Sequence, residues 1–184
     1  MNTLGEIKKI VLIGPESTGK STLCEQLARH FNTMWVPEHA RAYLNKNGTN
    51  YSLDDLSVIA KNQLADEEAI HAQLLADEKS DQRLLFIDTD MYVMKIWSEY
   101  VFGTCHPSIL NEIVYRKYDL YLLCEPDIPW VKDELREYPD LVTRHKLYHH
   151  YKDALVHQEV PWVNISGDYE KRFVTAIKAV EENL

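Results

Sequence analysis

The sequence predicts a three-layer α/β fold in which helices cover both faces of a five-stranded parallel sheet. Five short apolar segments alternate along the chain with segments of helical spacing, an order that is typical of parallel sheets. A glycine-rich stretch follows the first apolar segment, and folds of this class bind ligands beyond the carboxyl ends of their strands. The chain has 184 residues, 45% of them hydrophobic, which suits one compact domain over residues 1–184.

Five short apolar runs, bounded by turn residues or acids, are the predicted strands. They are IVLIG at 10–14, TMWVPEH at 33–39, RLLFIDTD at 83–90, YDLYLLCEPD at 118–127 and VPWVNIS at 160–166. Pro37 ends the second run, because proline cannot donate a ladder hydrogen bond. The third run stays apolar until it reaches its acids, as a strand buried on both faces does.

The predicted helices show apolar residues three or four positions apart or begin at a capping signal. They span 20–31, 40–46, 53–79, 91–102, 107–117 and 169–182. Ser52 and Asp55 have the spacing of a capping box, which opens the longest of these helices. Residues 132–148, between the fourth and fifth strands, are highly polar and charged. We expect this segment to form a mobile helical lid.

Composition argues against two classes of partner. The formal net charge is −9 and no basic run is present, so no nucleic-acid partner is expected. No apolar stretch approaches the roughly 20 residues that span a bilayer, and the opening residues MNTLGEIKK lack the apolar segment of a signal peptide. We therefore expect a cytoplasmic protein without a membrane partner. The sequence carries no signal for its oligomeric state.

The glycine-rich stretch GPESTGKS, residues 14–21, matches G-x-x-x-x-G-K-[ST] in full. Its glycines permit a turn whose N–H groups converge on an anion, and the following helix N-terminus adds partial positive charge. In such a phosphate-binding loop, or P-loop, Lys20 would reach the β- and γ-phosphates and the Ser21 hydroxyl would bind Mg²⁺. The predicted nucleotide-binding residues here are Gly14, Glu16, Ser17, Thr18, Gly19, Lys20, Ser21 and Thr22.

Asp88 ends the third predicted strand, where a P-loop protein places the carboxylate that holds the hydration shell of Mg²⁺. Ser21 and Asp88 are therefore the predicted metal ligands, and ATP and Mg²⁺ are the predicted cofactors. The alternative is that Asp88 caps the following helix, a role that Thr89 or Asp90 could fill equally.

The P-loop alone leaves several functions open. A GTPase is expected to carry N-K-x-D, which is absent, and a AAA-type motor is expected to have a larger chain and an arginine finger, so neither is favoured. A small-molecule kinase needs an acceptor site, a base for the hydroxyl proton and a lid that excludes water. The rival is a nucleotide switch or regulatory ATPase, which would hydrolyse ATP slowly whatever alcohol is present.

Candidates for all three kinase features are present. Glu38 and Arg41 follow the second predicted strand on one helical face, where Glu38 could accept a proton and Arg41 could neutralise charge. The alternative is an ion pair between them. Asp88 and Asp90 are the alternative candidates for the base. The predicted catalytic residues are Lys20, Glu38, Asp88, Arg136 and Arg144, and the predicted acceptor-binding residues are Glu38, Arg41, Asp90, Trp97, Tyr100 and Trp130.

The last candidates have ordinary alternatives. Arg136 and Arg144 could bind the phosphoryl group during transfer or could be solvated surface arginines. Trp97, Tyr100 and Trp130 could stack on a planar or cationic ring, although core packing is the commoner role of such side chains.

Four ordered blocks of the sequence resemble the NadR-type ribosylnicotinamide kinase domain. They are GPESTGKSTL at 14–23, VPEHARAYL at 36–44, FIDTDMYVMKIWSEYVFG at 86–103 and YDLYLLCEPDIPWVKDELRE at 118–137. The resemblance covers most of the chain and implies a P-loop kinase fold. It also implies ATP- and Mg²⁺-dependent phosphorylation of the 5′-hydroxyl of nicotinamide riboside to nicotinamide mononucleotide, a step of NAD salvage.

The resemblance further implies roles for individual residues. Lys20 and Ser21 would hold the ATP phosphates and metal, and Glu38, as the carboxylate after the second strand, would be the base, with Asp88 as the alternative. Arg41 and Asp90 would join Glu38 on the acceptor side. The loop after the last strand, with Gly167, would contact adenine.

Compared with larger members of that family, the chain begins almost at the P-loop and resembles a stand-alone form without the adenylyltransferase and helix-turn-helix regions. We therefore expect neither NAD synthesis from the mononucleotide nor DNA binding. Nicotinamide riboside is the favoured acceptor. Thiamine, another flat cationic alcohol, or an ordinary nucleoside is the alternative.

Overall fold

The computed structural model describes residues 6–77 and 83–184 and contains one sheet of five parallel strands, as predicted. The strands are β1 (Lys8–Ile13), β2 (Met34–Val36), β3 (Leu84–Asp88), β4 (Leu120–Cys124) and β5 (Trp162–Ile165). Their order in the sheet is β2-β3-β1-β4-β5. β1 therefore lies at the centre of the sheet, between β3 and β4.

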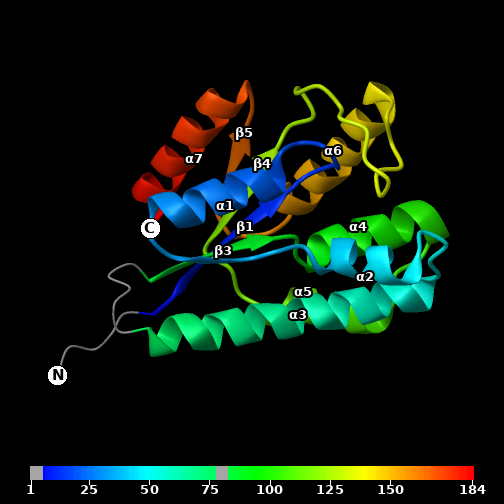
Figure 1. The fold of residues 1–184 in the computed structure, drawn as a ribbon, viewed down its shortest axis with the longest axis horizontal. Coiled ribbons are helices and arrows are strands. Elements are labelled where there is room, and N and C mark those ends of the chain that lie inside the picture. The colour runs from blue at the N-terminus through cyan, green and yellow to red at the C-terminus, as the bar shows by residue number, and fades with distance from the viewer. Residues whose placement is uncertain (1–5, 78–82) are drawn as a thin grey trace.

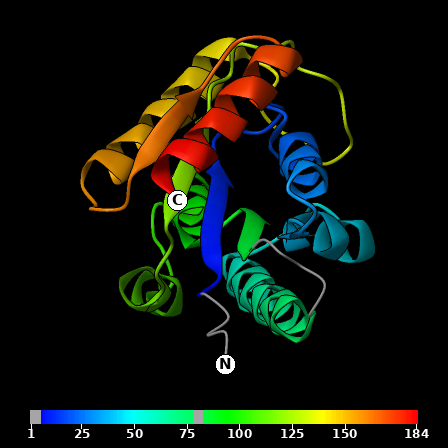
Figure 2. The same cartoon turned by 90° about the vertical axis from the view of Figure 1, so that its left-hand side faces the viewer.

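Helices cover both faces of this sheet and give the predicted three layers. They are α1 (Lys20–His30), α2 (His39–Asn47), α3 (Leu53–Ala76), α4 (Met91–Phe102), α5 (Pro107–Tyr115), α6 (Leu141–Val156) and α7 (Tyr169–Asn183). Figures 1 and 2 show α1 and α7 against one face, while α3, α4 and α6 contribute to the core on the other. Helices α2 and α5 pack on α3 and α4.

Side-chain alternation along β1 explains why both faces are covered. Ile10 and Leu12 pack into the core with α1 and α7, whereas Val11 and Ile13 pack into the core with α3, α4 and α6. All four are 0% exposed, and burial of an aliphatic side chain contributes about 1.5–3 kcal/mol. A strand with no polar face is stable only between two helical layers.

Strand register brings the functional segments together at one edge of the sheet. Leu12 of β1 pairs with Asp88 of β3, and Ile13 pairs with Leu123 of β4. The P-loop after β1 therefore lies between the end of β3 and the end of β4. This is the edge where open α/β sheets bind ligands.

Helix α6 departs from the predicted secondary structure. Only part of the predicted helical lid at 132–148 is helical. Residues 141–148 form the first half of α6, whereas residues 132–140 lie outside any helix or strand. Asp140 caps α6 by accepting a hydrogen bond from the Thr143 backbone N–H at 2.7 Å. The buried side chains of α6 recur with the helical period along one face; they are Arg144, Leu147, Tyr148, Tyr151 and Leu155.

The remaining helix bounds agree closely with the sequence. Helix α4 begins and ends at the predicted residues, and the Ser52–Asp55 capping box at the start of α3 is formed. Helix α3 ends at Ala76, earlier than the predicted residue 79; residues 78 and 79 lie outside the described part of the chain. None of the helices in the described ranges is long and apolar enough to cross a membrane.

The packing of α6 can be tested with two neighbouring residues. Leu155 is 0% exposed in the sheet-facing core and Val156 is 57% exposed. Leu155→Ala should lower the free energy of unfolding by about 2–5 kcal/mol, because it leaves a cavity, while Val156→Ala should change it by less than about 0.5 kcal/mol. Urea denaturation followed by circular dichroism measures both. Equal losses in the two variants would contradict the assigned face of α6.

Candidate active site

The P-loop is shaped by two glycines that no other residue can replace without strain. Gly14 has φ +139°, and a Cβ there would lie 2.5 Å from the Cys124 carbonyl oxygen of β4. Gly19, directly before α1, has φ +77°. A side chain at either position would disturb the turn that aims the loop N–H groups at one point.

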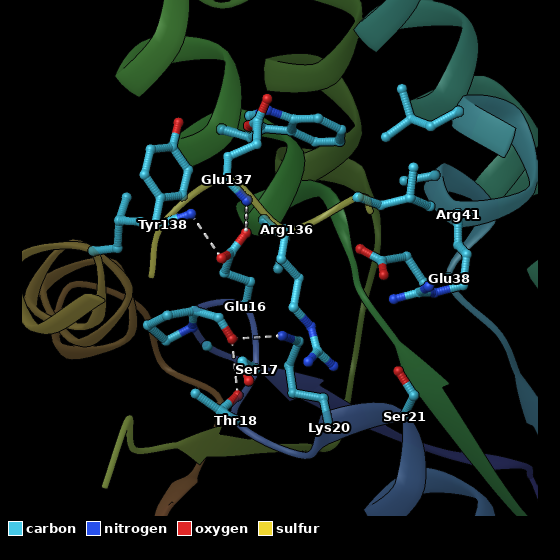
Figure 3. A pocket seen from close by; sticks show the side chains of 18 of the residues that line it. Glu16, Ser17, Thr18, Lys20, Ser21, Glu38, Arg41, Arg136, Glu137 and Tyr138 are labelled. Atoms are coloured by element: carbon cyan, nitrogen blue, oxygen red, sulfur yellow. Dashed lines mark hydrogen bonds between the residues drawn. The ribbon is translucent and has the colours of Figure 1, made fainter. Parts of the chain in front are cut away.

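Lys20 is held inside the loop by a backbone carbonyl. Its Nζ donates a hydrogen bond to the Pro15 oxygen at 2.8 Å, and the Thr18 hydroxyl donates to the same oxygen at 2.8 Å. Figure 3 shows Lys20 and Ser21 side by side at the loop end of the cavity. A phosphate group entering the loop would compete with the Pro15 carbonyl for the Lys20 ammonium.

Arg172 of α7 holds the P-loop through hydrogen bonds to backbone carbonyls. This role of Arg172 was not predicted from the sequence. It is 2% exposed, and its guanidinium donates to the Gly167 oxygen at 2.7 Å, the Thr18 oxygen at 3.1 Å and the Glu125 oxygen at 2.7 Å, and pairs with Asp127. The predicted adenine loop and the P-loop are thus tied to one side chain. A lone arginine on the apolar face of the last helix was the available signal.

A cavity of about 280 Å³ opens beside the P-loop. It is bounded by the P-loop, α2, α4, α6 and the loop that precedes α6. Most predicted site residues line it: Gly14, Glu16, Ser17, Thr18, Gly19, Lys20, Ser21, Thr22, Glu38, Arg41, Trp97, Tyr100 and Arg136. Asp88, Asp90, Trp130, Arg144 and Gly167 do not belong to the lining.

Glu38 enters the cavity from the junction of β2 and α2 (Figure 3). Its Oε1 accepts a hydrogen bond from the Thr89 hydroxyl at 3.4 Å. Arg41 pairs with Asp133 of the loop before α6, at 3.0 Å, so the alternative of an ion pair between Glu38 and Arg41 is wrong. Glu38 is left directed at the space between the P-loop and α4.

Asp88 is fully buried beneath the cavity. In the described part of the chain, no donor lies within hydrogen-bond distance of its carboxylate oxygens, although the Ser21 hydroxyl is near enough to lower its pKa. Burial, followed by the neighbouring Glu38 carboxylate, raises the pKa of Asp88 to about 7, although Lys20, Ser21 and Arg41 oppose the shift. A buried carboxylate without partners is a ready ligand for a cation.

Asp90 has a different role from the one predicted. Its Oδ1 accepts the backbone N–H groups of Tyr92 and Val93 at 3.0 and 3.2 Å, and its Oδ2 accepts the Tyr121 hydroxyl at 2.9 Å. It therefore caps α4, the role that was the alternative for Asp88, and does not face the acceptor. Burial raises the pKa of Asp90 to about 6 against the opposing effect of these hydrogen bonds.

Two further candidates are also placed elsewhere. Trp130 donates its indole N–H to Glu16 at 3.1 Å and lies outside the cavity lining, so it is not positioned to stack on an acceptor. Arg144 is 4% exposed and is therefore not the solvated arginine of the alternative interpretation. Its Nε and Nη1 have no partner within the described ranges. Arg136, in contrast, points toward the P-loop (Figure 3).

An aromatic wall closes the cavity opposite the P-loop. The Trp97 indole donates to the Tyr51 hydroxyl at 2.8 Å, and that hydroxyl donates to Glu137 at 2.9 Å. Tyr100 and Tyr138 meet edge to face, with ring centroids 5.5 Å apart. Burial raises the pKa of Glu137 and of Tyr51. Sequence reasoning found Trp97 and Tyr100 but missed Tyr51, Glu137 and Tyr138, which come from distant segments.

Comparisons with known proteins agree with this geometry. A family model described as "AAA domain" matches residues 9–172. The trifunctional NAD biosynthesis/regulator proteins NadR of Salmonella typhimurium and Escherichia coli are each 29% identical over 181 residues, which is 96% of this chain and 42% of the relative. The chain thus spans less than half the length of these curated relatives.

Solved structures show the same fold. NadR in complex with NR superposes with a TM-score of 0.75, and NadR in complex with NAD and AMP-PNP with 0.69; each is 23% identical and is matched over 96% of this chain and 49% of the other. Thymidylate kinase from Ehrlichia chaffeensis, 12% identical, gives 0.59 over 96% of this chain and its own whole length.

The relatives confirm the resemblance to the NadR-type kinase domain that the four sequence blocks carry. The family model covers most of the chain and spans the P-loop, Asp88 and Arg172. The chain therefore belongs to the AAA domain family of P-loop proteins and, within it, resembles the NadR-type kinase domain.

Proposed function

We propose that this chain transfers the γ-phosphoryl group of ATP to the 5′-hydroxyl of nicotinamide riboside, giving nicotinamide mononucleotide and ADP. The observation that carries the proposal is one cavity with a P-loop at one end and an aromatic, acidic wall at the other. A kinase for a small alcohol needs both ends within reach of each other, whereas a nucleotide switch needs only the first.

The phosphate end suits ATP with a divalent cation. Ser21 and Asp88 would hold Mg²⁺, which supplies positive charge to the β- and γ-phosphates when bound. The fit rests on Asp88, whose buried carboxylate oxygens have no hydrogen-bond partner within the described ranges. No group of three or more His, Cys, Asp or Glu residues in those ranges forms a metal site by itself, which is consistent with a cation held jointly by protein and phosphates.

The acceptor end suits a flat cationic ring. Tyr51, Trp97 and Tyr100 line the cavity together with Glu137, and aromatic faces and carboxylates both attract cations. The pyridinium ring of nicotinamide riboside has this character, and NadR has been solved in complex with NR, the abbreviation for nicotinamide riboside. An uncharged nucleoside would leave the Glu137 carboxylate, whose pKa is raised by partial desolvation, without a cation.

Glu38 is the proposed base. The acceptor oxygen would attack the γ-phosphorus while the bond between that phosphorus and the leaving oxygen of ADP breaks. The hydroxyl proton of the acceptor would pass to the Glu38 carboxylate. Lys20 and Arg136 would bind the transferred oxygens, since both cationic side chains belong to the cavity lining. Arg144 would join them only after a change of side-chain conformation.

The first test measures ADP release with Mg-ATP and a panel of acceptors. Nicotinamide riboside should raise turnover well above the rate without acceptor, and Lys20→Ala should abolish it because the phosphates lose their cation. Turnover driven by thiamine or a nucleoside instead would keep the kinase but change its substrate. Slow hydrolysis that ignores every acceptor would favour the nucleotide switch or regulatory ATPase.

Glu38→Gln tests the base. It should lower kcat by roughly a hundredfold or more, because the amide cannot take the hydroxyl proton, while the Kd for a fluorescent ADP analogue stays unchanged. Glu25→Gln, an exposed glutamate on α1 paired with Arg29, is the matched control and should behave as wild type. A near-normal kcat for Glu38→Gln would transfer the role to Asp88.

Asp88→Asn tests the electrostatics of the metal site without any activity assay. The pKa of Asp88 is about 7 in the folded protein against 3.8 as its ordinary value, so the folded state binds the proton more tightly and stability falls as pH rises from about 4 to 7. Asp88→Asn removes this loss.

Calorimetry should therefore find Asp88→Asn more stable than wild type at pH 8, on the order of 2 kcal/mol, with the gap narrowing toward pH 4. Asp54→Asn, at an exposed aspartate of α3, is the control and should give no such trend. A variant that is less stable than wild type at pH 8 would refute the raised pKa.

A further inference from the structure

Glu16 occupies a variable position of the P-loop but makes its contacts outside that loop. Its Oε1 accepts hydrogen bonds from the Trp130 indole at 3.1 Å and from the Tyr138 backbone N–H at 2.8 Å. Its Oε2 accepts the Glu137 backbone N–H at 2.9 Å. Figure 3 shows the carboxylate directed at Glu137 and Tyr138, away from Lys20.

The next P-loop residue binds the same segment. The Ser17 hydroxyl accepts the Val131 backbone N–H at 3.1 Å. Two consecutive P-loop side chains therefore receive four donors of the β4–α6 loop, which is defined here as residues 125–140, between the end of β4 and the start of α6. That loop contains no helix or strand, so contacts of this kind decide its position.

The contacts of Glu16 reach the acceptor side of the cavity. Glu137 and Tyr138 line the cavity, and Tyr51 donates to Glu137 at 2.9 Å. Holding the backbone of these two residues fixes part of the aromatic wall relative to the phosphate site. The distance between acceptor and phosphate therefore depends in part on the Glu16 carboxylate.

Charge gives a second reason to assign Glu16 a specific role. A carboxylate in a loop that binds polyphosphate repels its ligand, so it is unfavourable there unless it makes compensating contacts. Three N–H donors, two of them from the backbone, provide that compensation. An apolar side chain would avoid this repulsion but could not accept the three N–H donors of the β4–α6 loop.

We infer that Glu16 is a positioning residue that docks the β4–α6 loop on the P-loop and thereby couples nucleotide binding to the geometry of the acceptor wall. Phosphates that bind the backbone N–H groups of the P-loop fix the backbone of Glu16, and its carboxylate passes that order to Glu137 and Tyr138. The docking stands on the contacts alone, while its consequence for the acceptor rests on the proposed function.

Hydrogen exchange of a peptide covering residues 130–140 tests the docking directly. In Glu16→Ala the Glu137 and Tyr138 amides should exchange at least about tenfold faster than in wild type. Glu16→Gln should give a smaller increase, since its one remaining carbonyl oxygen can still accept hydrogen bonds. Glu134→Gln removes a carboxylate from the same loop without touching Glu16 and should leave exchange unchanged. Unchanged exchange in Glu16→Ala would overturn the docking.

The coupling is tested by adding Mg-AMP-PNP. The nucleotide should slow exchange of this peptide in wild type and in Glu134→Gln, and should have at most a third of that effect in Glu16→Ala. A merely structural role would change exchange equally with and without nucleotide. An undiminished nucleotide effect in Glu16→Ala would therefore overturn the coupling.

Kinetics then distinguish this inference from the proposed function. In Glu16→Ala the KM for nicotinamide riboside should rise at least about tenfold, while the Kd of a fluorescent ADP analogue changes by less than about threefold. A KM equal to that of wild type would overturn the effect on the acceptor wall. If the wild-type protein phosphorylates no acceptor, the proposed function is wrong. The two hydrogen-exchange experiments would still test the role of Glu16.

Discussion

The close packing of the P-loop on the end of β4 is the constraint on which the rest of the site depends. Gly14 approaches the Cys124 carbonyl so closely that a Cβ would lie 2.5 Å from its oxygen. Because β1 is also paired with β3, with Leu12 beside Asp88, the end of β1 places the P-loop next to the Asp88 carboxylate, the proposed cation ligand. Arg172 then fixes the P-loop from the other side through the Thr18 carbonyl. The position of the phosphate site therefore follows from strand register and from one glycine, before any ligand is considered.

The proposed site binds a polyanion but contains several carboxylates, whose negative charges would repel that ligand. Each carboxylate is stabilised in a different way. Glu16 satisfies its charge with three N–H donors. Asp88 has a pKa raised to about 7 by burial and by Glu38. Glu137 accepts the Tyr51 hydroxyl, and burial raises its pKa. A positive charge would stabilise the buried Asp88 at the phosphate end and the partly desolvated Glu137 at the acceptor end. A divalent cation with ATP and a cationic ring as acceptor fit that pattern better than two neutral ligands.

Secondary structure and the phosphate end of the site could be predicted because their signals are local. Apolar runs identified all five strands, and the motif at residues 14–21 identified the P-loop without any tertiary information. Helix α6 was predicted only in part, as a helical lid at 132–148, because its buried face includes Arg144 and two tyrosines and its composition is therefore polar. Tyr51, Glu137 and Tyr138 were missed because they converge only through packing of segments far apart in the chain. Asp88 and Asp90 could be separated only by their contacts, since both stand at the end of the same strand.

Thr89, between these two aspartates, shows how one strand end serves two purposes. It has φ +83°, a conformation that is unfavourable by about 1–3 kcal/mol for a β-branched residue. The turn lets Asp88 end β3 beneath the P-loop while Asp90, two residues later, caps α4 and accepts the Tyr121 hydroxyl. The hydrogen bonds of Asp90 satisfy its buried carboxylate, and they hold the strained turn in place. The Thr89 hydroxyl meanwhile contacts Glu38. The strain at Thr89 is therefore linked to the relative positions of Asp88, the proposed metal ligand, and Glu38, the proposed base. It persists because the register of β3 fixes the chain before Thr89 and the cap of α4 fixes it after.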